Sequence, residues 1–390
     1  MGFGFLGNVF KPGTADYEKA NNIYATSTYG VERDMNPGLI YQPVDIPDIQ
    51  EVLTIANRSD PFTPVAIRTG GHQYSGASST NHEGIQLDLQ STFRDPVNDL
   101  QMIRKDGKVF IRSSVSWKLQ ELYNFLLKNG VFLPTGQCIT VCLGGHVQTG
   151  GYGMLGRSFG LLGDYITELE IVDHTGTEVT ASKTSNQDLF YGFLGGSPGN
   201  LGILTHFTVE VQDDNNYQGS KGIGSSKVIA SSLTPYAKHT GSTNSTNLSN
   251  NNWSAWFSRQ IEKATKTKGL FVSSQIQVYG GNNSMFWKNA SEATAYSWRD
   301  ATVVGTWDVF YNNAQAAAEA WQKDTAAGAL TYFDSNERRL LWGSYDNWDM
   351  TQVWQHYYDR TTYQRLQQIR KTHDPNGLFT ANLFCVQAAK

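Results

Sequence analysis

The sequence predicts a mixed fold of helices and strands that is divided into two domains. Segments typical of strands and helices alternate up to about residue 212, which indicates an α/β or α+β domain. The chain has 390 residues, 39% of them hydrophobic, which is enough for a large core and long for a single one. Asp, Asn, Gly and Ser then dominate residues 213–226. We therefore expect a first domain over residues 1–212 and a second over residues 213–345.

Periodicity and turn residues predict the elements of the first domain. A helix is expected over 47–57, with Asp45 as its cap and Pro47 in its first turn. Gly130 ends another expected helix, over 116–130. The further predictions are a helix at 17–28, strands at 65–69, 84–89, 109–115 and 201–211, a hairpin at 168–181 and a final helix at 363–371.

Charge and composition exclude several classes of protein. A net charge of -4 argues against a nucleic-acid partner, because no broad positive field is available. We find no apolar stretch that could span a bilayer, no signal-peptide pattern and no metal-ligand spacing among the histidines. Six glycosylation sequons favour secretion weakly: Asn57, Asn244, Asn247, Asn252, Asn282 and Asn289. The three cysteines cannot form a disulfide framework.

Two glycine-rich segments carry the functional signal. The first runs from Arg68 to Gly76 and the second from Gly136 to Gly153. Eight of the twenty residues from 144 to 163 are glycine, against roughly 7% in average proteins. Glycine lets the backbone approach a ligand and direct N–H groups at it, so a pyrophosphate can be held without a charged side chain. The alternative for each Gly-Gly pair is an ordinary turn.

A histidine lies in the first glycine-rich segment and a cysteine in the second. An imidazole nitrogen and a thiolate are both nucleophiles, and both can add to the electrophilic carbons of an isoalloxazine ring. Taken singly, His72 would be a structural histidine and Cys138 a core thiol. Their spacing alone does not decide between these interpretations.

At these residues the chain resembles the berberine-bridge-enzyme-like branch of the FAD-linked oxidases. The family motif Arg-Ser-Gly-Gly-His-Ser-Tyr is similar to Arg68–Tyr74, and its Cys-Pro-Thr-Val-Gly-X-Gly-Gly-His motif is similar to Cys138–His146. The resemblance implies that His72 bonds the 8α carbon of FAD and that Cys138 bonds C6. Cys142 falls on a family glycine, and the register with Gly144-Gly145-His146 favours Cys138.

Further segments extend the resemblance over nearly the whole chain. Residues 195–203 are similar to a family segment that lies on the FAD, and 293–300 to a stretch of its substrate domain. Residues 357–366 and Asp374-Pro375 are similar to its C-terminal signature. The implied fold is α+β: a two-part FAD-binding domain of the PCMH type, and an antiparallel substrate domain with helices on one face. Residues 346–390 are implied to return to the FAD domain.

The resemblance also implies which residues contact the cofactor. Besides His72 and Cys138, they are Arg68, Thr69, Gly70, Gly71, Gln73, Gly136, Thr140, Gly144, Gly145, His146, Gly150, Gly151, Gly153, Asn200, Gly202 and Ile203.

Catalysis in the sugar-oxidising members uses a tyrosine as base, and the matching position is Tyr345. An ordinary tyrosine has a pKa near 10, so deprotonation at pH 7 costs about 4 kcal/mol and the site must assist it. Tyr74 is the second candidate for the base. The family's acidic helper falls on Gln277, in the segment that begins at Gln275, and a glutamine cannot take a proton.

Val141 occupies the family position that lines the oxygen pocket, where valine accompanies oxidases. The resemblance thus implies an oxidase of an alcohol or a sugar hemiacetal, with O2 as acceptor and H2O2 as product. The alternative is oxidative tailoring, by cyclisation or desaturation, of a secondary metabolite. The expected partners are a small sugar, alcohol or aromatic substrate and O2, with neither nucleic acid nor membrane, for a chain expected to be monomeric and secreted.

Overall fold

The computed structural model describes residues 4–22, 35–59, 61–73, 77–217, 242–244, 252–301, 303–311, 314, 316–321, 324–325, 338–340, 350–379 and 383–390. Within these ranges, every helix falls short of the length and apolar character needed to cross a membrane.

The first sheet places the first glycine-rich segment at a strand end. Its order is β1-β2-β4-β3, with β2, β4 and β3 parallel and β1 antiparallel to β2. The strands are β1 (Asn8–Phe10), β2 (Leu39–Gln42), β4 (Ile85–Asp88) and β3 (Val65–Arg68), with helices α1 (Ala15–Asn21) and α2 (Ile46–Arg58). The α2 face with Ile49 and Leu53 is buried, and the Asp45 side chain caps the helix. Because β3 ends at Arg68, residues 69–73 lie at the carboxyl end of a parallel strand, where ligands commonly bind in such sheets.

The second sheet is antiparallel and has five strands in the order β5-β6-β10-β8-β9. They are β5 (Leu100–Lys105), β6 (Lys108–Ser114), β10 (Ile203–Glu210), β8 (Ile166–Val172) and β9 (Glu178–Ser182). The β8–β9 hairpin closes over Asp173 and Gly176, whose φ of 85° requires glycine. Beside the sheet lie α3 (Leu119–Asn129), α4 (Leu143–Gln148), α5 (Gly156–Phe159) and α6 (Gln187–Phe193), the turns η1 (Leu162–Tyr165) and η2 (Asp214–Asn216), and the short pair β7 (Val131–Phe132) and β11 (Gln212–Asp213).

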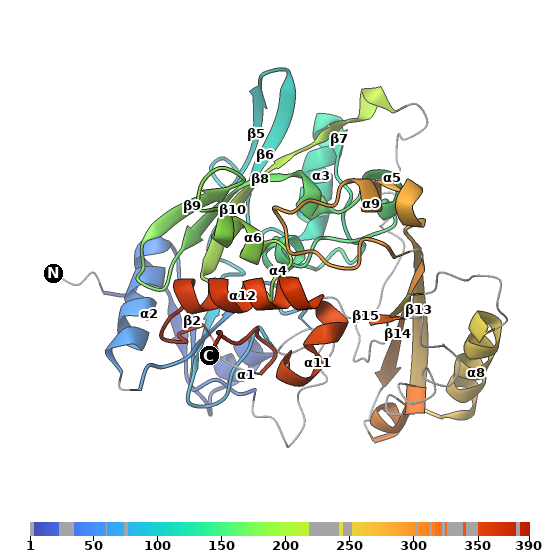
Figure 1. The fold of residues 1–390 in the computed structure, drawn as a ribbon. Helices are drawn as coiled ribbons and strands as arrows, with labels where there is room; N and C mark the ends of the chain where they lie inside the picture. Colours follow the sequence, from blue (N-terminus) through green and yellow to red (C-terminus); the bar gives the residue numbers. More distant parts are fainter. Residues whose placement is uncertain are drawn as a thin grey trace.

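The third sheet belongs to the second half of the chain and is also antiparallel, in the order β13-β14-β12-β15. Its strands are β13 (Leu270–Val278), β14 (Val303–Tyr311), β12 (Ser242–Asn244) and β15 (Arg338–Leu340). Trp256 of α8 (Asn252–Lys266) packs with Val309 and Trp321, so helical residues cover one face of these strands. Figure 1 shows α8 on the outer side of β13 and β14.

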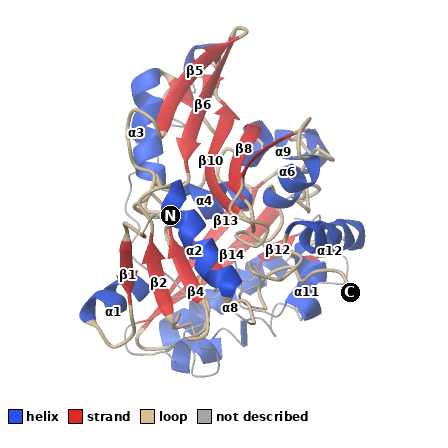
Figure 2. Cartoon of the chain, turned by 90° about the vertical axis from the view of Figure 1, so that its left-hand side faces the viewer, coloured by secondary structure: helices blue, strands red, loops and turns tan. Residues whose placement is uncertain are grey.

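The C-terminal helices return to the first half of the chain. In Figure 1, α11 (Met350–Tyr357) and α12 (Arg360–His373) lie across the front of the molecule, between the earlier sheets and β13–β14. Leu366 of α12 and Tyr296 belong to the same buried cluster as Leu122 and Ile171. Figure 2 shows the first and second sheets from the side, with β13 and β14 behind them. One large core therefore joins segments far apart in sequence, including α9 (Met285–Lys288) through Phe286. The short turn η3 (Gly281–Asn283) precedes α9.

Most elements agree with the predictions within a few residues, and two helices differ from them. The helix predicted from residue 116 begins at Leu119, because the Glu121 carboxylate accepts the Lys118 amide and closes the first turn there. The helix predicted over 17–28 spans Ala15–Asn21, and residues 23–34 lie outside the described ranges. Gln212 and Asp213 pair with β7. The boundaries 1–212, 213–345 and 346–390 remain predictions.

Candidate functional site

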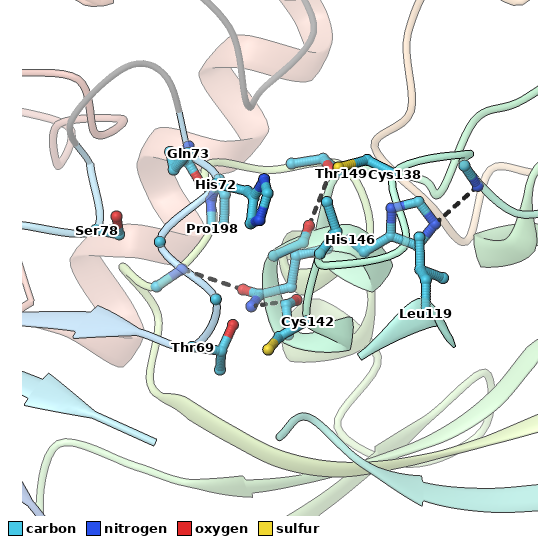
Figure 3. A pocket seen from close by; sticks show the side chains of 18 of the residues that line it. Thr69, His72, Gln73, Ser78, Leu119, Cys138, Cys142, His146, Thr149 and Pro198 are labelled. Carbon is cyan, nitrogen blue, oxygen red and sulfur yellow. Dashed lines mark hydrogen bonds between the residues drawn. The ribbon is translucent and has the colours of Figure 1, made fainter. Parts of the chain in front are cut away.

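A deep cleft lies where both glycine-rich segments meet the second half of the chain. It holds about 1260 Å³ of empty space, its open mouth included, and most of its lining comes from residues 67–73, 136–153 and 198–204. Gln277 of β13 completes one side. Figure 3 shows His72, Cys138, His146 and Cys142 around this space.

The glycines of these segments bring their backbones into contact. A Cβ on Gly70 would lie 2.8 Å from the backbone nitrogen of Cys142, and one on Gly144 would lie 2.8 Å from the Thr69 Cγ2. A Cβ on Gly153 would overlap the Thr135 carbonyl oxygen, at 1.9 Å. Larger residues would push the two segments apart, so the glycines define the shape of the cleft.

His72 and Cys138 lie at the two ends of a short polar chain that runs through Thr140. The Thr140 Oγ1 is 3.1 Å from the His72 Nε2 and 3.4 Å from the Cys138 Sγ. Burial lowers the pKa of His72 to about 4, the positive charge of Lys118 adds to this, and a hydrogen bond to the Thr140 backbone opposes it. His72 is therefore neutral at pH 7, and a single hydroxyl joins it to the thiol.

Cys142 has a different environment from Cys138. Its side chain is 1% exposed, packed against Gly70, and burial raises the pKa of its thiol to about 11. Cys142 precedes α4 and lies opposite Lys118 in an antiparallel bridge, in which the Leu143 N–H donates to the Trp117 carbonyl. The thiol is therefore protonated at neutral pH, and a protonated thiol is a poor nucleophile.

His146 presents one nitrogen to its own segment. The Gly136 N–H donates to the His146 Nε2 at 3.1 Å, and burial lowers the pKa of His146 to about 4. Since the neutral ring accepts at Nε2, its proton is on Nδ1. His146 also lines the cleft.

Gln277 is held by a buried tyrosine. The Tyr279 hydroxyl donates to the Gln277 Oε1. Burial raises the pKa of Tyr279, so its hydroxyl keeps the proton that it donates. The tyrosine ring is itself fixed by stacking on Phe286, with 4.1 Å between ring centroids and 14° between planes. This network places the Gln277 amide at the β13 side of the cleft.

Most residues singled out from the sequence lie on this cleft. Those that line it are Arg68, Thr69, Gly70, Gly71, His72, Gln73, Gly136, Cys138, Val141, Gly144, Gly145, His146, Gly153, Gly202 and Gln277. Thr140, Gly150, Gly151, Asn200 and Ile203 lie beside it without lining it. Gln275 is on β13, and its side chain is outside the described part, as are Tyr74 and Tyr345.

Two of the predicted contact residues have structural partners. The Arg68 guanidinium donates to the Asp88 carboxylate at 2.8 Å, with both side chains buried, and so ties β3 to β4. The Asn200 amide donates to the Ser197 hydroxyl and to the Val386 carbonyl.

Sequence reasoning missed several lining residues, among them Ser78, Leu119, Gln148, Thr149 and Pro198. Gln148 is the most consequential, because its Oε1 accepts the Gly199 N–H at 3.1 Å and its Nε2 donates to the Gly144 carbonyl. It thus joins α4 to the 195–202 segment. Its place inside the second glycine-rich segment was the only signal for it.

Comparisons with known proteins agree with this geometry. Residues 37–182 match the FAD binding domain family. Berberine bridge enzyme-like 12 of Arabidopsis thaliana is 36% identical over 148 residues, 37% of this chain and 27% of that protein. FAD-dependent monooxygenase drtC of Aspergillus calidoustus is 30% identical over 206 residues, 52% of this chain and 36% of that protein. The matched segments thus span about a third of these relatives or less.

Solved structures share the fold over the whole length. Glucooligosaccharide oxidase from Acremonium strictum, whose FAD is described as 6-S-cysteinyl and 8α-N1-histidyl, has a TM-score of 0.79 at 15% identity, covering 98% of this chain and 97% of that one. Wild-type Physcomitrella patens BBE-like 1 has a TM-score of 0.76 at 18% identity, covering 98% of both chains. The predicted α+β, PCMH-type fold is confirmed. The chain carries an FAD-binding domain and is a homologue of the berberine bridge enzyme-like, FAD-linked oxidoreductases.

Proposed function

We propose that this protein is a bicovalent FAD-dependent oxidase of alcohols or sugar hemiacetals. The observation that carries the proposal is that His72 and Cys138, which both line the cleft, meet at one hydroxyl beside it: Nε2 and Sγ are 3.1 and 3.4 Å from the Thr140 Oγ1. Two nucleophiles of different chemistry at the edge of a flavin site suit two bonds to one ring.

The residues present fit an FAD. The backbones around Gly70, Gly144 and Gly153 leave no space for side chains, so glycine at these positions lets the protein segments close together around the cleft in which an FAD would lie. A bound flavin would accept a hydride at N5 and pass two electrons to O2, which yields H2O2. His72 and Cys138 would anchor the ring at 8α and C6, and the His146 Nδ1–H would donate to an acceptor in the cleft.

We propose Tyr345 as the base that takes the hydroxyl proton of the substrate, with Tyr74 as the second candidate. Replacing Tyr345 by Phe removes only a hydroxyl. We expect kcat to fall by about 10²- to 10⁴-fold, the usual range for a lost acid–base group, while flavin content stays unchanged. Steady-state kinetics with the best substrate measures this, and activity within about threefold of wild type would move the base to Tyr74.

Gln277 bears on the class of substrate. An amide held by the Tyr279 hydroxyl can bind a substrate hydroxyl but cannot accept its proton. This observation favours, as a second candidate, a substrate that needs no carboxylate helper, as in cyclisation or desaturation of a secondary metabolite. The two candidates differ in the compounds that reduce the flavin.

The experiment is anaerobic mixing of the purified protein with mono- and oligosaccharides, aromatic alcohols and a set of phenolic or alkaloid-like compounds. Bleaching of the flavin absorption by sugars or alcohols, followed by stoichiometric H2O2 when O2 is admitted, is the expected result. Bleaching only by the third set would support oxidative tailoring. Bleached protein that stays reduced in air would overturn the assignment as an oxidase.

Three broader properties are proposed with this function. The chain acts on a small molecule and O2 as a monomer, and it is secreted. Of the sequons, Asn282 is exposed, whereas the amides of Asn57 and Asn289 donate to backbone carbonyls. Asn282 is therefore the best-placed acceptor for a glycan among these three. Residues 1–212 and 346–390 would hold the flavin and 213–345 the substrate.

A further inference from the structure

Thr140 is an exposed residue that a rigid turn holds in a fixed place. The Val141 N–H donates to the Cys138 carbonyl at 3.1 Å, which closes the turn. The first amides of α3 hold this turn in place. The Leu119 N–H donates to the Val141 carbonyl at 2.8 Å, and the Gln120 N–H donates to the Ile139 carbonyl at 3.1 Å. The position of the Thr140 hydroxyl between His72 and Cys138 therefore follows from the backbone.

A threonine hydroxyl has one proton to donate and two lone pairs to accept with. Between a neutral imidazole and a thiol, it can therefore be arranged in two ways. In the first, the thiol donates to Thr140 and Thr140 donates to the His72 Nε2, so the ring proton is on Nδ1. In the second, Nε2–H donates to Thr140 and Thr140 donates to the Cys138 thiolate, so Nδ1 has a lone pair.

Only the second arrangement makes both residues nucleophilic, with a thiolate on Cys138 and an unprotonated Nδ1 on His72. Moving from the first to the second transfers the thiol proton to the Thr140 oxygen while the Thr140 proton moves to Nε2. The Nδ1 proton then leaves to solvent. The net change is the loss of one proton from the pair, with no change in oxidation state.

We propose that Thr140 is a positioning residue that couples the ionisation of Cys138 to the tautomer of His72, so that both are competent for flavin attachment together. This inference rests on the proposed two-bond attachment. Thr140 does not line the cleft, and its proposed role is in attaching the cofactor and not in turnover.

The test counts the flavin bonds in purified, full-length protein. Thr140→Val keeps the shape of the side chain and removes the hydroxyl. Because a lost hydrogen bond to an ionised group is worth about a factor of ten or more, we expect the fraction with a Cys138–flavin bond to fall at least tenfold at a fixed time after FAD loading. Mass spectrometry of the intact protein and of flavin-containing peptides measures it. Thr140→Ser, which retains the hydroxyl, should restore attachment.

The matched control is Thr372→Val. The Thr372 hydroxyl is exposed like that of Thr140 but lies outside the cleft lining and donates to the Gln368 carbonyl, so attachment should stay at the wild-type level. If Thr140→Val and Thr372→Val lower attachment equally, or if neither does, the role of Thr140 is refuted.

A double-mutant cycle separates coupling from local structure. In a His72→Ala background the imidazole that takes up the relayed proton is gone while the direct contact between Thr140 and Cys138 remains, so adding Thr140→Val should lower attachment at Cys138 by a smaller factor than in the wild type. An effect as large as in the wild type would show that Thr140 acts without His72. Wild-type protein that carries no covalent flavin would instead refute the two-bond attachment itself, which distinguishes the two failures.

Discussion

At the scale of single residues, the environment of each side chain decides its chemistry more than its type does. Cys138 and Cys142 are four positions apart and both line the cleft. Only Cys138 touches the hydroxyl that also contacts His72, whereas Cys142 is a buried thiol with a pKa raised to about 11. The motif register and the burial of the thiols point to the same residue.

We predict that Cys138→Ala leaves one covalent bond to the flavin, through His72, and that Cys142→Ala leaves both. The reason is that attack on the ring needs a thiolate, which burial disfavours at Cys142. Acid precipitation followed by absorption spectroscopy of the pellet and peptide mass mapping measures the bonds. The reverse pattern would place the linkage at Cys142.

A substitution at Val141 would test how O2 reaches the cofactor. Val141 lines the cleft and packs partly against the main core. Val141→Leu adds one methylene to a packed wall and should fill the small cavity that a diatomic molecule needs. Stopped-flow measurement should therefore show slower reoxidation by O2 and little change in reduction by substrate. Equal O2 rates in the variant and the wild type would exclude Val141 as the gate.

At the scale of elements, the ends of α12 show how differently two aspartates contribute to one helix. Asp359 caps its N-terminus from an exposed position. At the other end Asp374 is fully buried, binds Arg370 at 2.7 Å and accepts the amides of Leu378 and Phe379. The first is a local cap, and the second also fixes the chain that follows.

We predict that Asp374→Asn lowers the free energy of unfolding by about 3 kcal/mol, because it removes the countercharge of a buried guanidinium. Asp359→Ala, the comparison at the other end of the helix, should lower the free energy of unfolding by about 1 kcal/mol. Urea denaturation followed by circular dichroism gives both values. A smaller loss for Asp374→Asn than for Asp359→Ala would contradict this ranking.

At the scale of the whole molecule, the C-terminal residues close the fold onto the cleft. The Val386 N–H donates to the Ser197 hydroxyl at 2.7 Å, and the Val386 carbonyl accepts the Asn200 amide at 3.2 Å. Ser197 and Asn200 flank Gly199, which lines the cleft. The last residues of the chain therefore support a wall of the site nearly two hundred positions earlier.

We predict that Ser197→Ala lowers the free energy of unfolding by about 1–3 kcal/mol, because it leaves the buried Val386 N–H without its acceptor. Ser182→Ala is the matched control: its hydroxyl accepts the amides of Thr184 and Ser185 in an exposed turn, and its loss should cost less than about 1 kcal/mol. The midpoints of urea denaturation compare the two. Equal costs would mean that the C-terminal contact is not a structural tie.

Much of this molecule follows from local sequence. Cap and turn residues such as Asp45 and Gly130 mark where helices begin and end, because their preferences act over a few positions. The family resemblance implied the α+β fold and named most of the residues that line the cleft, since motif spacing keeps them together in the chain.

Only the tertiary structure decided the rest. The contact of the Thr140 hydroxyl with His72 and the Gln148 link from α4 to Gly199 join residues that are far apart in the chain and that no local preference relates. The ionisation of each thiol and imidazole likewise depends on burial, which is a property of the packed core. The sequence by itself thus determined which groups are present and where the elements lie, and packing determined which groups meet and in what protonation state.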